Sequence, residues 1–297
     1  MPSMRDKFTA TTIDLLESDP RTTLVLADIG ASSFAGAPRV HNVGIREQAM
    51  IGVTAGLALS GLRPIAHSYA PFLIERPFEQ IKLDFGHQDL SAILVSIGAS
   101  YDAAMEGRTH QSPGDVSLLS TLPGWTIHVP GHPDEAEGLL RSAAAGGDRV
   151  YIRLTEDSNS APHRVGEGLV TIRTSWAPGA TVIAVGPMLD RVAAATADLN
   201  VTLLYANTVR PFDRLGLAAA ATGTDVVLVE PYLVGTSAAE VSAALSSRPS
   251  RLLSIGVPKI ETRRYGTRHQ HDASYGLDIA GLRTRIVSFL DGGRGDQ

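Results

Sequence analysis

Cysteine is absent from this 297-residue sequence. Its absence excludes disulfide bonds, thiolate nucleophiles and cysteine-ligated metal sites. Long apolar runs are absent too: no stretch reaches the roughly 18 residues of a transmembrane helix, and the N-terminus lacks the apolar core of a signal peptide. Positive charge is not in excess, because the net charge is −5, which argues against a nucleic-acid-binding surface. We therefore expect a soluble, cytoplasmic protein with neither nucleic-acid nor membrane partners.

Glycine-rich phosphate-binding loops are also missing, since neither G-x-G-x-x-G nor G-x-x-x-x-G-K-S/T occurs in the sequence. This chain alone therefore offers no standard nucleotide cradle. What is present is typical of a globular protein: 43% of the residues are hydrophobic and 19% are charged. The length is sufficient for two domains, each with its own core.

Short apolar runs alternate with helical patterns along the chain, which is typical of parallel sheets covered by helices on both faces. A polar stretch at 156–168 interrupts this alternation and is interpreted as a linker. We expect an α/β fold of two consecutive three-layer α/β/α domains with mostly parallel sheets, at residues 1–160 and 161–297. The predicted strands are 23–27, 63–67, 91–97, 125–129, 149–153, 181–185, 201–205, 225–229 and 251–255. The predicted helices are 6–17, 46–60, 72–85 with a break at Pro77, 116–121, 133–145, 188–199, 211–221, 236–245 and 279–290.

A single carboxylate, Glu47, stands in the first turn of the predicted helix 46–60. The residues behind it are almost all small or apolar, so the helix lacks the polar face of a surface helix and is predicted to be buried nearly all round. Two interpretations stay open on this pattern. Glu47 either caps free backbone N–H groups, helped by the helix dipole, or it carries chemistry.

The loop 106–111, Glu-Gly-Arg-Thr-His-Gln, brings an acid, a base and several hydrogen-bond donors together directly after a predicted buried strand. In a parallel sheet the loops at the carboxyl ends of strands are where ligands bind. His67 and His110 both lie near predicted strand ends, although a single histidine there is more often structural. Phe72 is more typical of a core residue than of a cofactor platform. These patterns indicate a site and do not specify its reaction.

Residues 42–61 resemble the pyrimidine-binding domain of the transketolase family of thiamine-diphosphate enzymes, and most closely the stand-alone C-terminal subunits of split transketolases. Residues 69–81 resemble the aromatic segment of that family, and residues 106–111 resemble its active-site histidine loop. Residues 209–213 and 229–230 are similar to its C-terminal domain, here closer to deoxyxylulose-phosphate synthase. The resemblance therefore covers essentially the whole chain.

The resemblance implies that Glu47 is catalytic and hydrogen-bonds a ring nitrogen of the cofactor's pyrimidine. It also implies that Phe72 stacks on that ring, with Tyr69 and Arg76 as further cofactor-binding residues; flat aromatic faces suit a flat heteroaromatic ring. His110 matches a catalytic histidine near the donor carbonyl, where it stabilises charge on oxygen or shuttles a proton.

The substrate-binding residues implied by the resemblance are His110, Glu106, His67 and Arg153. Glu106 stands where the family commonly has an aspartate that contacts the donor's hydroxyl groups. Arg153 matches an arginine that binds the acceptor's phosphate, a usual role of the guanidinium fork. The sequence also departs from the family near Gly98, where a histidine is common.

The diphosphate- and magnesium-binding motif of the family, Gly-Asp-Gly followed by Asn, does not occur in the sequence. We expect thiamine diphosphate to lie at an interface with a separate N-terminal subunit that holds the diphosphate and Mg²⁺, in an α2β2 assembly, and we expect no metal ligand from this chain. The expected activity is transfer of a two-carbon ketol unit from a ketose or ketose phosphate to an aldehyde. The alternatives are the beta subunit of a 2-oxo-acid dehydrogenase, an acyloin or ketol transferase of secondary metabolism, and a non-enzymatic scaffold subunit.

Overall fold

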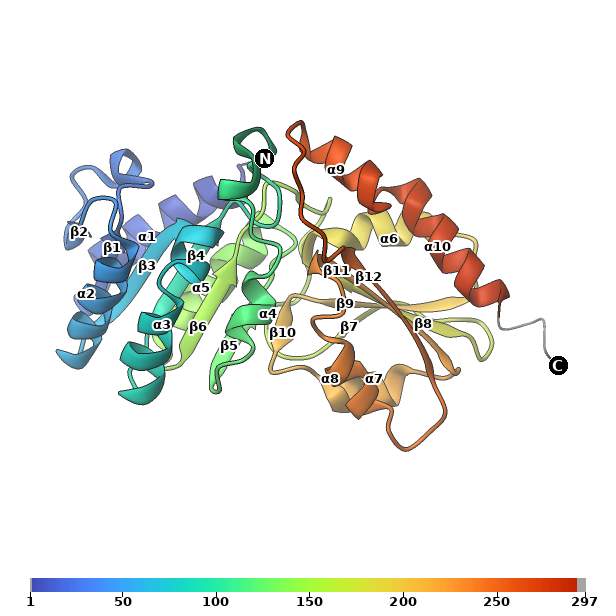
Figure 1. Ribbon diagram of the computed structural model, residues 1–297. Coiled ribbons are helices and arrows are strands. Elements are labelled where there is room, and N and C mark those ends of the chain that lie inside the picture. The colour runs from blue at the N-terminus through green and yellow to red at the C-terminus, as the bar shows by residue number, and fades with distance from the viewer. Residues whose placement is uncertain (1, 293–297) are drawn as a thin grey trace.

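Seven strands form the first sheet of the computed structural model, which describes residues 2–292 (Figure 1). Their order is β10-β5-β6-β4-β3-β1-β2, and every pair is parallel except β10 with β5. A row of apolar residues in register crosses the middle of the sheet, from Leu24 through Ile65 and Ile93 to Val150. The strands are β1 (Thr22–Leu26), β2 (Val40–Asn42), β3 (Arg63–Tyr69), β4 (Ile93–Ile97), β5 (Trp125–His128), β6 (Arg149–Arg153) and β10 (Thr208–Arg210).

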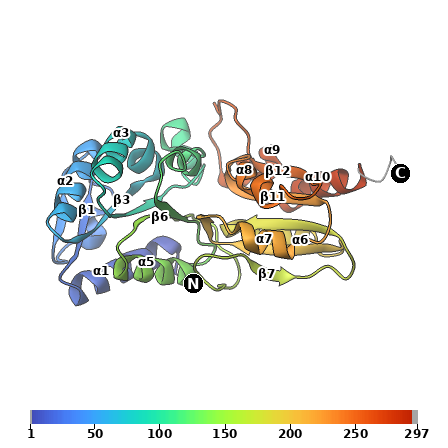
Figure 2. The same ribbon diagram turned by 90° about the horizontal axis from the view of Figure 1, so that it is seen from below.

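Helices cover both faces of this sheet. Figure 2 shows α1 (Met4–Ser18) and α5 (Pro133–Ala145) on one face, and α2 (Glu47–Leu59) and α3 (Phe78–Gln80) on the other. Side chains of β4 alternate between the two cores, as the period of a strand requires: Ile93 packs under α1 and α5, whereas Leu94 packs under α2. The second face is completed by the π-helical turns η2 (Pro71–Glu75) and η3 (Ile81–His87) and by α4 (Asp115–Leu119).

The predicted helix 72–85 is interrupted at Pro77, as expected from the missing N–H of proline. The segment consists of η2, α3 and η3, with Pro77 at the N-terminal boundary of α3. Such π-helical turns are often found at functional sites, and η2 carries Phe72, one of the predicted site residues.

The prediction that helix 46–60 is buried nearly all round is wrong within this chain. Its inner face is buried in the core, with Met50 and Ile51 fully covered. The opposite face is open to solvent, and Val53 and Leu59 are 38% and 70% exposed. A helix with no polar side has no sequence signal that distinguishes a face covered by its own sheet from a face left open.

Five strands form the second sheet, in the order β12-β11-β8-β9-β7, and all of its pairs are parallel except β7 with β9. Figure 1 shows its helices in two groups on opposite faces, with α6 and α10 on one face and α7 and α8 on the other. The strands are β7 (Val170–Arg173), β8 (Ala180–Val185), β9 (Val201–Ala206), β11 (Asp225–Leu233) and β12 (Arg251–Val257). The helices are α6 (Leu189–Ala195), α7 (Arg214–Ala220), α8 (Ala238–Ala244), α9 (Arg268–Tyr275) and α10 (Ile279–Asp291).

The α/β class with mostly parallel sheets is thus confirmed, while several elements differ from the expectation. The short strands β2, β7 and β10 and helix α9 were not predicted. The helix expected from 211 begins only at Arg214, because the Asp213 side chain accepts a hydrogen bond of 2.7 Å from the Gly216 N–H and caps the helix there.

The two sheets are joined through β10. This strand comes from the second half of the sequence, yet it pairs with β5 of the first sheet, where Thr208 lies opposite His128. The Thr208 hydroxyl lies 2.9 Å from Nδ1 of His128. The division at residue 160 stays a prediction, since one strand of the first sheet lies beyond it. Within residues 2–292, every helix is too short or too polar to cross a bilayer.

Candidate active site

Glu47 begins helix α2 at the carboxyl ends of β1 and β2. The loop that leads to it is shaped by Asn42, whose Oδ1 accepts hydrogen bonds from the backbone N–H groups of Asp28 and Gly44. Gly44 has a φ of +69°, a conformation that favours glycine. The Glu47 side chain is only 2% exposed. A buried carboxylate is therefore held at the sheet edge where parallel α/β proteins bind ligands.

The Glu47 carboxylate is paired with Arg76. Nη1 of Arg76 donates to Oε2 of Glu47 over 2.6 Å, and the same guanidinium lies 4.2 Å from the centroid of the Phe72 ring. Gln48 contributes a longer hydrogen bond of 3.4 Å to the Arg76 carbonyl. Glu47 is the first residue of α2, and its carboxylate faces this guanidinium. The ion pair, and not helix capping, is what the structure gives this carboxylate.

Three rings gather beside this ion pair, and each comes from a different element. Tyr69 ends β3, Phe72 lies in η2, and His110 ends the 3₁₀ segment η4 (Ala104–His110). The ring centroids of Phe72 lie 5.0 Å from His110 and 6.0 Å from Tyr69, and Tyr69 lies 5.7 Å from His110. All three rings are partly buried and meet edge to face. The structure thus brings five of the predicted site residues into one cluster.

Gly98 is required by the position of Tyr69. A Cβ atom at Gly98 would overlap the Tyr69 ring, and the φ of Gly98 is +68°. The Tyr69 ring occupies the space in which a side chain at position 98 would lie. The glycine at position 98 and the placement of Tyr69 are therefore one structural feature.

Glu106 belongs to η4, three residues before Thr109, and its side chain is exposed. The Thr109 hydroxyl donates to the Glu106 carbonyl over 3.3 Å and lies 2.9 Å from Nδ1 of His110. Thr109 thereby ties the backbone at Glu106 to the His110 ring. Glu106 shares the segment of the catalytic candidate without joining the cluster of rings.

His67 lies elsewhere, in the core under α1. It is 1% exposed, its Nδ1 is 2.8 Å from the Val95 carbonyl, and its ring lies 4.5 Å from that of Phe8. Burial lowers the pKa of His67 to about 4. This burial does not support a substrate-binding role for His67. A position at a strand end does not by itself determine which face of the sheet the side chain takes.

Arg153 is also separated from the cluster, and it is completely buried. Its Nε donates to Oδ2 of Asp115 over 2.7 Å, its Nη2 donates to the Ser100 hydroxyl over 2.7 Å, and its guanidinium lies 5.4 Å from the Tyr232 ring centroid. The Tyr151 hydroxyl donates to the same Asp115 oxygen. The expectation that Arg153 binds a phosphate is not supported, because its charge is already paired inside the protein.

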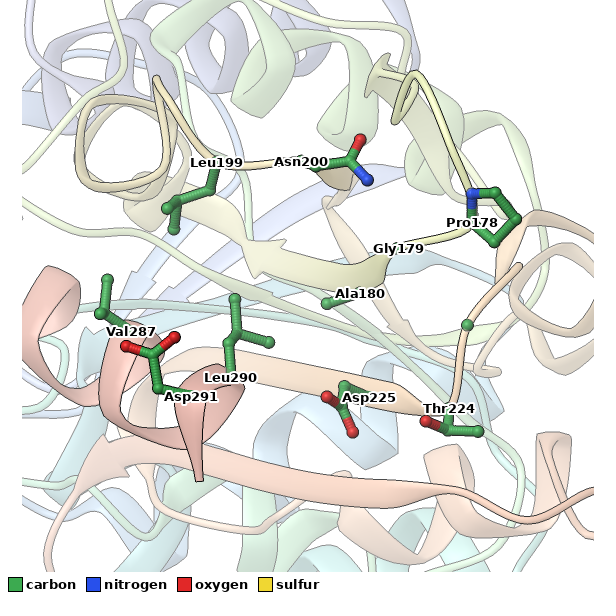
Figure 3. Close-up of a pocket in the computed structure, with 11 residues that line it drawn as sticks. Pro178, Gly179, Ala180, Leu199, Asn200, Thr224, Asp225, Val287, Leu290 and Asp291 are labelled. Atoms are coloured by element: carbon green, nitrogen blue, oxygen red, sulfur yellow. The ribbon is translucent and has the colours of Figure 1, made fainter. Parts of the chain in front are cut away.

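Residues 2–292 contain no group of three or more histidine, aspartate or glutamate side chains arranged to hold a metal ion. A separate hollow of about 350 Å³ lies in the second half, between the amino ends of β8 and β11 and the last turn of α10 (Figure 3). Pro178, Asn200 and Leu290 are among its lining residues, and its Asp225 is already paired with Arg251 over 2.7 Å. This hollow includes none of the predicted site residues.

Residues 1–160 match the family described as "Transketolase, pyrimidine binding domain". The chain is 51% identical to an uncharacterized 33.6 kDa protein in the fasciation locus of Rhodococcoides fascians, over 95% of this chain and 93% of that protein. It is 26% identical to an apulose-4-phosphate transketolase subunit of Phocaeicola vulgatus, over 98% of both chains.

The chain also matches 1-deoxy-D-xylulose-5-phosphate synthase of Thioalkalivibrio sulfidiphilus at 28% identity, but it spans only 47% of the length of that protein. Among solved structures, one titled "Split gene transketolase, inactive beta4 tetramer" has a TM-score of 0.84 and 24% identity over 97% of this chain and 98% of that one. At that identity the structural likeness establishes the fold.

Proposed function

Since this chain belongs to the transketolase pyrimidine-binding family, we propose that it is the C-terminal subunit of a split transketolase. It transfers a two-carbon ketol unit from a ketose or ketose phosphate to an aldehyde acceptor. Members of this family depend on thiamine diphosphate, and we propose the same dependence here. The apulose-4-phosphate transketolase relative, which is itself a subunit and matches this chain over 98% of both lengths, supports the assignment.

The observation that carries this proposal is the buried Glu47 carboxylate beside the cluster of three rings. A pyrimidine ring needs a flat apolar face and a polar partner for its ring nitrogen. Phe72 and Tyr69 supply partly buried aromatic faces. The Arg76 guanidinium lies between Glu47 and Phe72 and contacts both. These residues fit the pyrimidine end of thiamine diphosphate.

Each side chain of the cluster then has a defined task. Glu47 would hydrogen-bond the ring nitrogen, and its burial would keep water from competing for that hydrogen bond. Phe72 and Tyr69 orient the ring. Arg76, which now covers one face of Phe72, moves along the carboxylate to admit it. His110 donates to or accepts from oxygen atoms of the substrate. Bound thiamine diphosphate supplies the carbon nucleophile that takes up the two-carbon unit.

We further propose that a second type of chain covers the open face of α2 and completes the site. Val53 and Leu59 are exposed on the same helix that begins with Glu47. An exposed apolar helix face of this kind is typical of an interface. The solved β-only tetramer is titled inactive, which supports the need for a partner in that protein and, by likeness of fold, here. The partner would hold the diphosphate and Mg²⁺ in an α2β2 assembly in the cytoplasm.

The test is Glu47→Gln in the complex of this chain with its diphosphate-binding partner, supplied with thiamine diphosphate, Mg²⁺ and a panel of ketose, ketose-phosphate and 2-oxo-acid donors. The amide keeps the size of the side chain and removes its proton-sharing oxygen, so kcat should fall by roughly 10²-fold or more. Assembly measured by light scattering should be unchanged. The matched control is Glu79→Gln, at an exposed carboxylate of α3.

Turnover by the Glu47→Gln complex close to that of the unmodified complex would contradict this proposal. Selective turnover of a 2-oxo acid would assign the chain to the 2-oxo-acid dehydrogenase alternative. Turnover of a non-phosphorylated ketol donor alone would assign it to the ketol-transferase alternative, in keeping with the buried, unavailable guanidinium of Arg153.

A further inference from the structure

The segment that carries His110, residues 100–113 (the His110 segment), is held at both ends by strand β11 of the second sheet. At its start, the Ser100 hydroxyl donates to the Pro231 carbonyl over 2.6 Å. At its end, the Leu233 N–H donates to the Pro113 carbonyl over 2.7 Å. Ser112 closes the base of the loop through a hydrogen bond of 2.9 Å from its N–H to the Ser100 carbonyl. The loop is thus pinned to the other half of the molecule.

Helix α9 contacts the same segment near its start. The Tyr101 hydroxyl donates to Oδ1 of Asp272 over 2.6 Å, and Asp102 forms an ion pair of 3.0 Å with Arg268. Tyr101 also stacks on His271, with ring centroids 5.2 Å apart. These side chains of the His110 segment are buried. The contact is therefore a packed interface and not a surface ion pair.

The loop between β12 and α9 contacts the middle of the His110 segment, and Figure 1 shows it rising beside the green segment at residues 104–110. The Tyr265 ring lies against Gly107: a Cβ there would be 2.5 Å from Cε1 of Tyr265. Gly107 has a φ of +69° and breaks the helical geometry of η4. Next to it, Nε of Arg108 pairs with Oε1 of Glu261 over 3.2 Å, and Nη1 of Arg108 donates to the Gln111 carbonyl over 3.0 Å.

The His110 segment has little internal structure with which to hold its own shape. It consists of 3₁₀ turns interrupted at Gly107, and such short turns are weakly held on their own. His110 lies three residues after Gly107 and one residue before the carbonyl that Arg108 binds. The second half of the chain therefore contacts the segment before His110, through Tyr265 at Gly107 and Glu261 at Arg108, and after it, through the Leu233 N–H at Pro113.

We propose that the second half of this chain positions His110, with Tyr265 and Glu261 as positioning residues that act through Gly107 and Arg108. All the site residues predicted from the sequence lie in the first half of the chain, within residues 1–160. The expected effect on turnover rests on the proposed function, whereas the expected effect on the order of the His110 segment does not. Turnover and the order of the segment are therefore measured separately.

The experiment compares Tyr265→Ala with Tyr265→Phe in the complex with the partner chain. The alanine removes the ring from Gly107, and the phenylalanine keeps it. Amide hydrogen exchange of residues 104–111 should be about tenfold faster in Tyr265→Ala, with β3 and β4 unchanged. kcat should fall by about tenfold, since a displacement of about 1 Å costs up to about 10²-fold and a smaller one is expected here, while the KM for thiamine diphosphate stays constant. Tyr265→Phe should match the unmodified protein in both measurements.

Unchanged exchange at residues 104–111 in Tyr265→Ala overturns the inference, and so does faster exchange throughout the protein. Should Tyr265→Ala fail to fold, Glu261→Gln gives the same test at a side chain that is 60% exposed. Faster exchange limited to 104–111 then supports the inference, and unchanged exchange opposes it. A complex without turnover before any substitution contradicts the proposed function alone, because exchange still reports on the contact.

Discussion

The Glu47 carboxylate forms an ion pair with Arg76 of the same chain. The Arg76 guanidinium, 39% exposed, bridges Oε2 of Glu47 and the Phe72 face, so both surfaces that a pyrimidine ring would use are in contact with one movable side chain. Because the Glu47 side chain is only 2% exposed, loss of this ion pair would leave a buried charge without its partner. Arg76 therefore compensates the charge of the buried Glu47 carboxylate in this chain.

A prediction at the residue scale concerns His67. Its pKa is lowered by burial to about 4, against an ordinary value of 6.5, so the unfolded chain binds a proton that the folded chain refuses. The stability due to neutral His67 is complete above pH 6.5 and is lost as the pH falls toward 4, by up to roughly 3 kcal/mol.

Urea unfolding at pH 7, 6 and 5 checks this. In His67→Gln the free energy of unfolding should fall less steeply with acid than in the unmodified protein. Part of the slope should stay, since burial also lowers the pKa of His128 to about 4. His41→Gln, at an exposed position, is the control and should keep the full slope. Equal slopes for His67→Gln and the unmodified protein would contradict the prediction.

The site residues differ in how far the sequence could identify them. Glu47, Phe72 and His110 lie in segments with a specific order and spacing, and the structure brings these residues together. The resemblance implied that His67 and Arg153 bind substrate, and both lie at or near strand ends, but a position at a strand end does not determine whether a side chain points into the core. Both are buried there by packing partners that are distant in sequence, Phe8 and Asp115.

At the scale of elements, α2 is the helix whose interpretation changed most. Its inward residues follow helical spacing from Glu47 through Met50 and Ile51 to Thr54, and all are buried. Its outward residues are just as poor in charge, and within residues 2–292 Val53 and Leu59 stay 38% and 70% exposed. The apolar sequence predicted the buried inner face of α2 correctly, but the prediction that the helix is buried nearly all round is wrong, because Val53 and Leu59 are exposed in this chain.

Val53→Asp tests the open face of α2. A carboxylate at this position stays solvated in the free chain, so the fold should persist, whereas in the complex it would be buried without a partner. We expect the affinity for the partner chain to fall by roughly 100-fold, or about 3 kcal/mol. Analytical ultracentrifugation of the mixed chains measures this.

Leu215→Asp on α7 is the matched control, because Leu215 is 85% exposed and lies on the second half. It should assemble as the unmodified chain does. If Val53→Asp bound the partner with unchanged affinity, the open face of α2 would not be the interface.

At the scale of the molecule, the two halves meet through a buried relay of polar groups. Asp115 pairs with Arg153, Arg153 donates to Ser100, and Ser100 donates to Pro231 of β11. The alternation of strands and helices within each half could be predicted because it is a local pattern. The relay and strand β10 could not, because they join residues far apart in sequence and leave no periodic signal.

Breaking this relay should strongly destabilise the chain. Arg153→Met leaves Asp115 buried without its counter-charge and should cost about 3–5 kcal/mol in the free energy of unfolding. Arg153→Met combined with Asp115→Leu should cost less than the sum of the single changes, because neither charge is then left alone. Urea unfolding at pH 7 measures all three.

The exposed pair of Arg214 and Glu240, with a separation of 2.7 Å and side chains 54% and 25% exposed, is the control. Arg214→Met should cost less than about 1 kcal/mol. Losses of equal size in Arg153→Met and Arg214→Met would show that burial of the relay adds nothing.

Strand β10 also determines how this chain responds to being cut. It is the edge of the first sheet, only three residues long, and it shields β5. A fragment that ends before Thr208 would keep all the helices of the first sheet, yet it would expose a row of unpaired N–H and C=O groups along β5. Such an edge recruits strands from other molecules. Proteolysis between the halves would thus yield an aggregation-prone fragment instead of an independently stable domain.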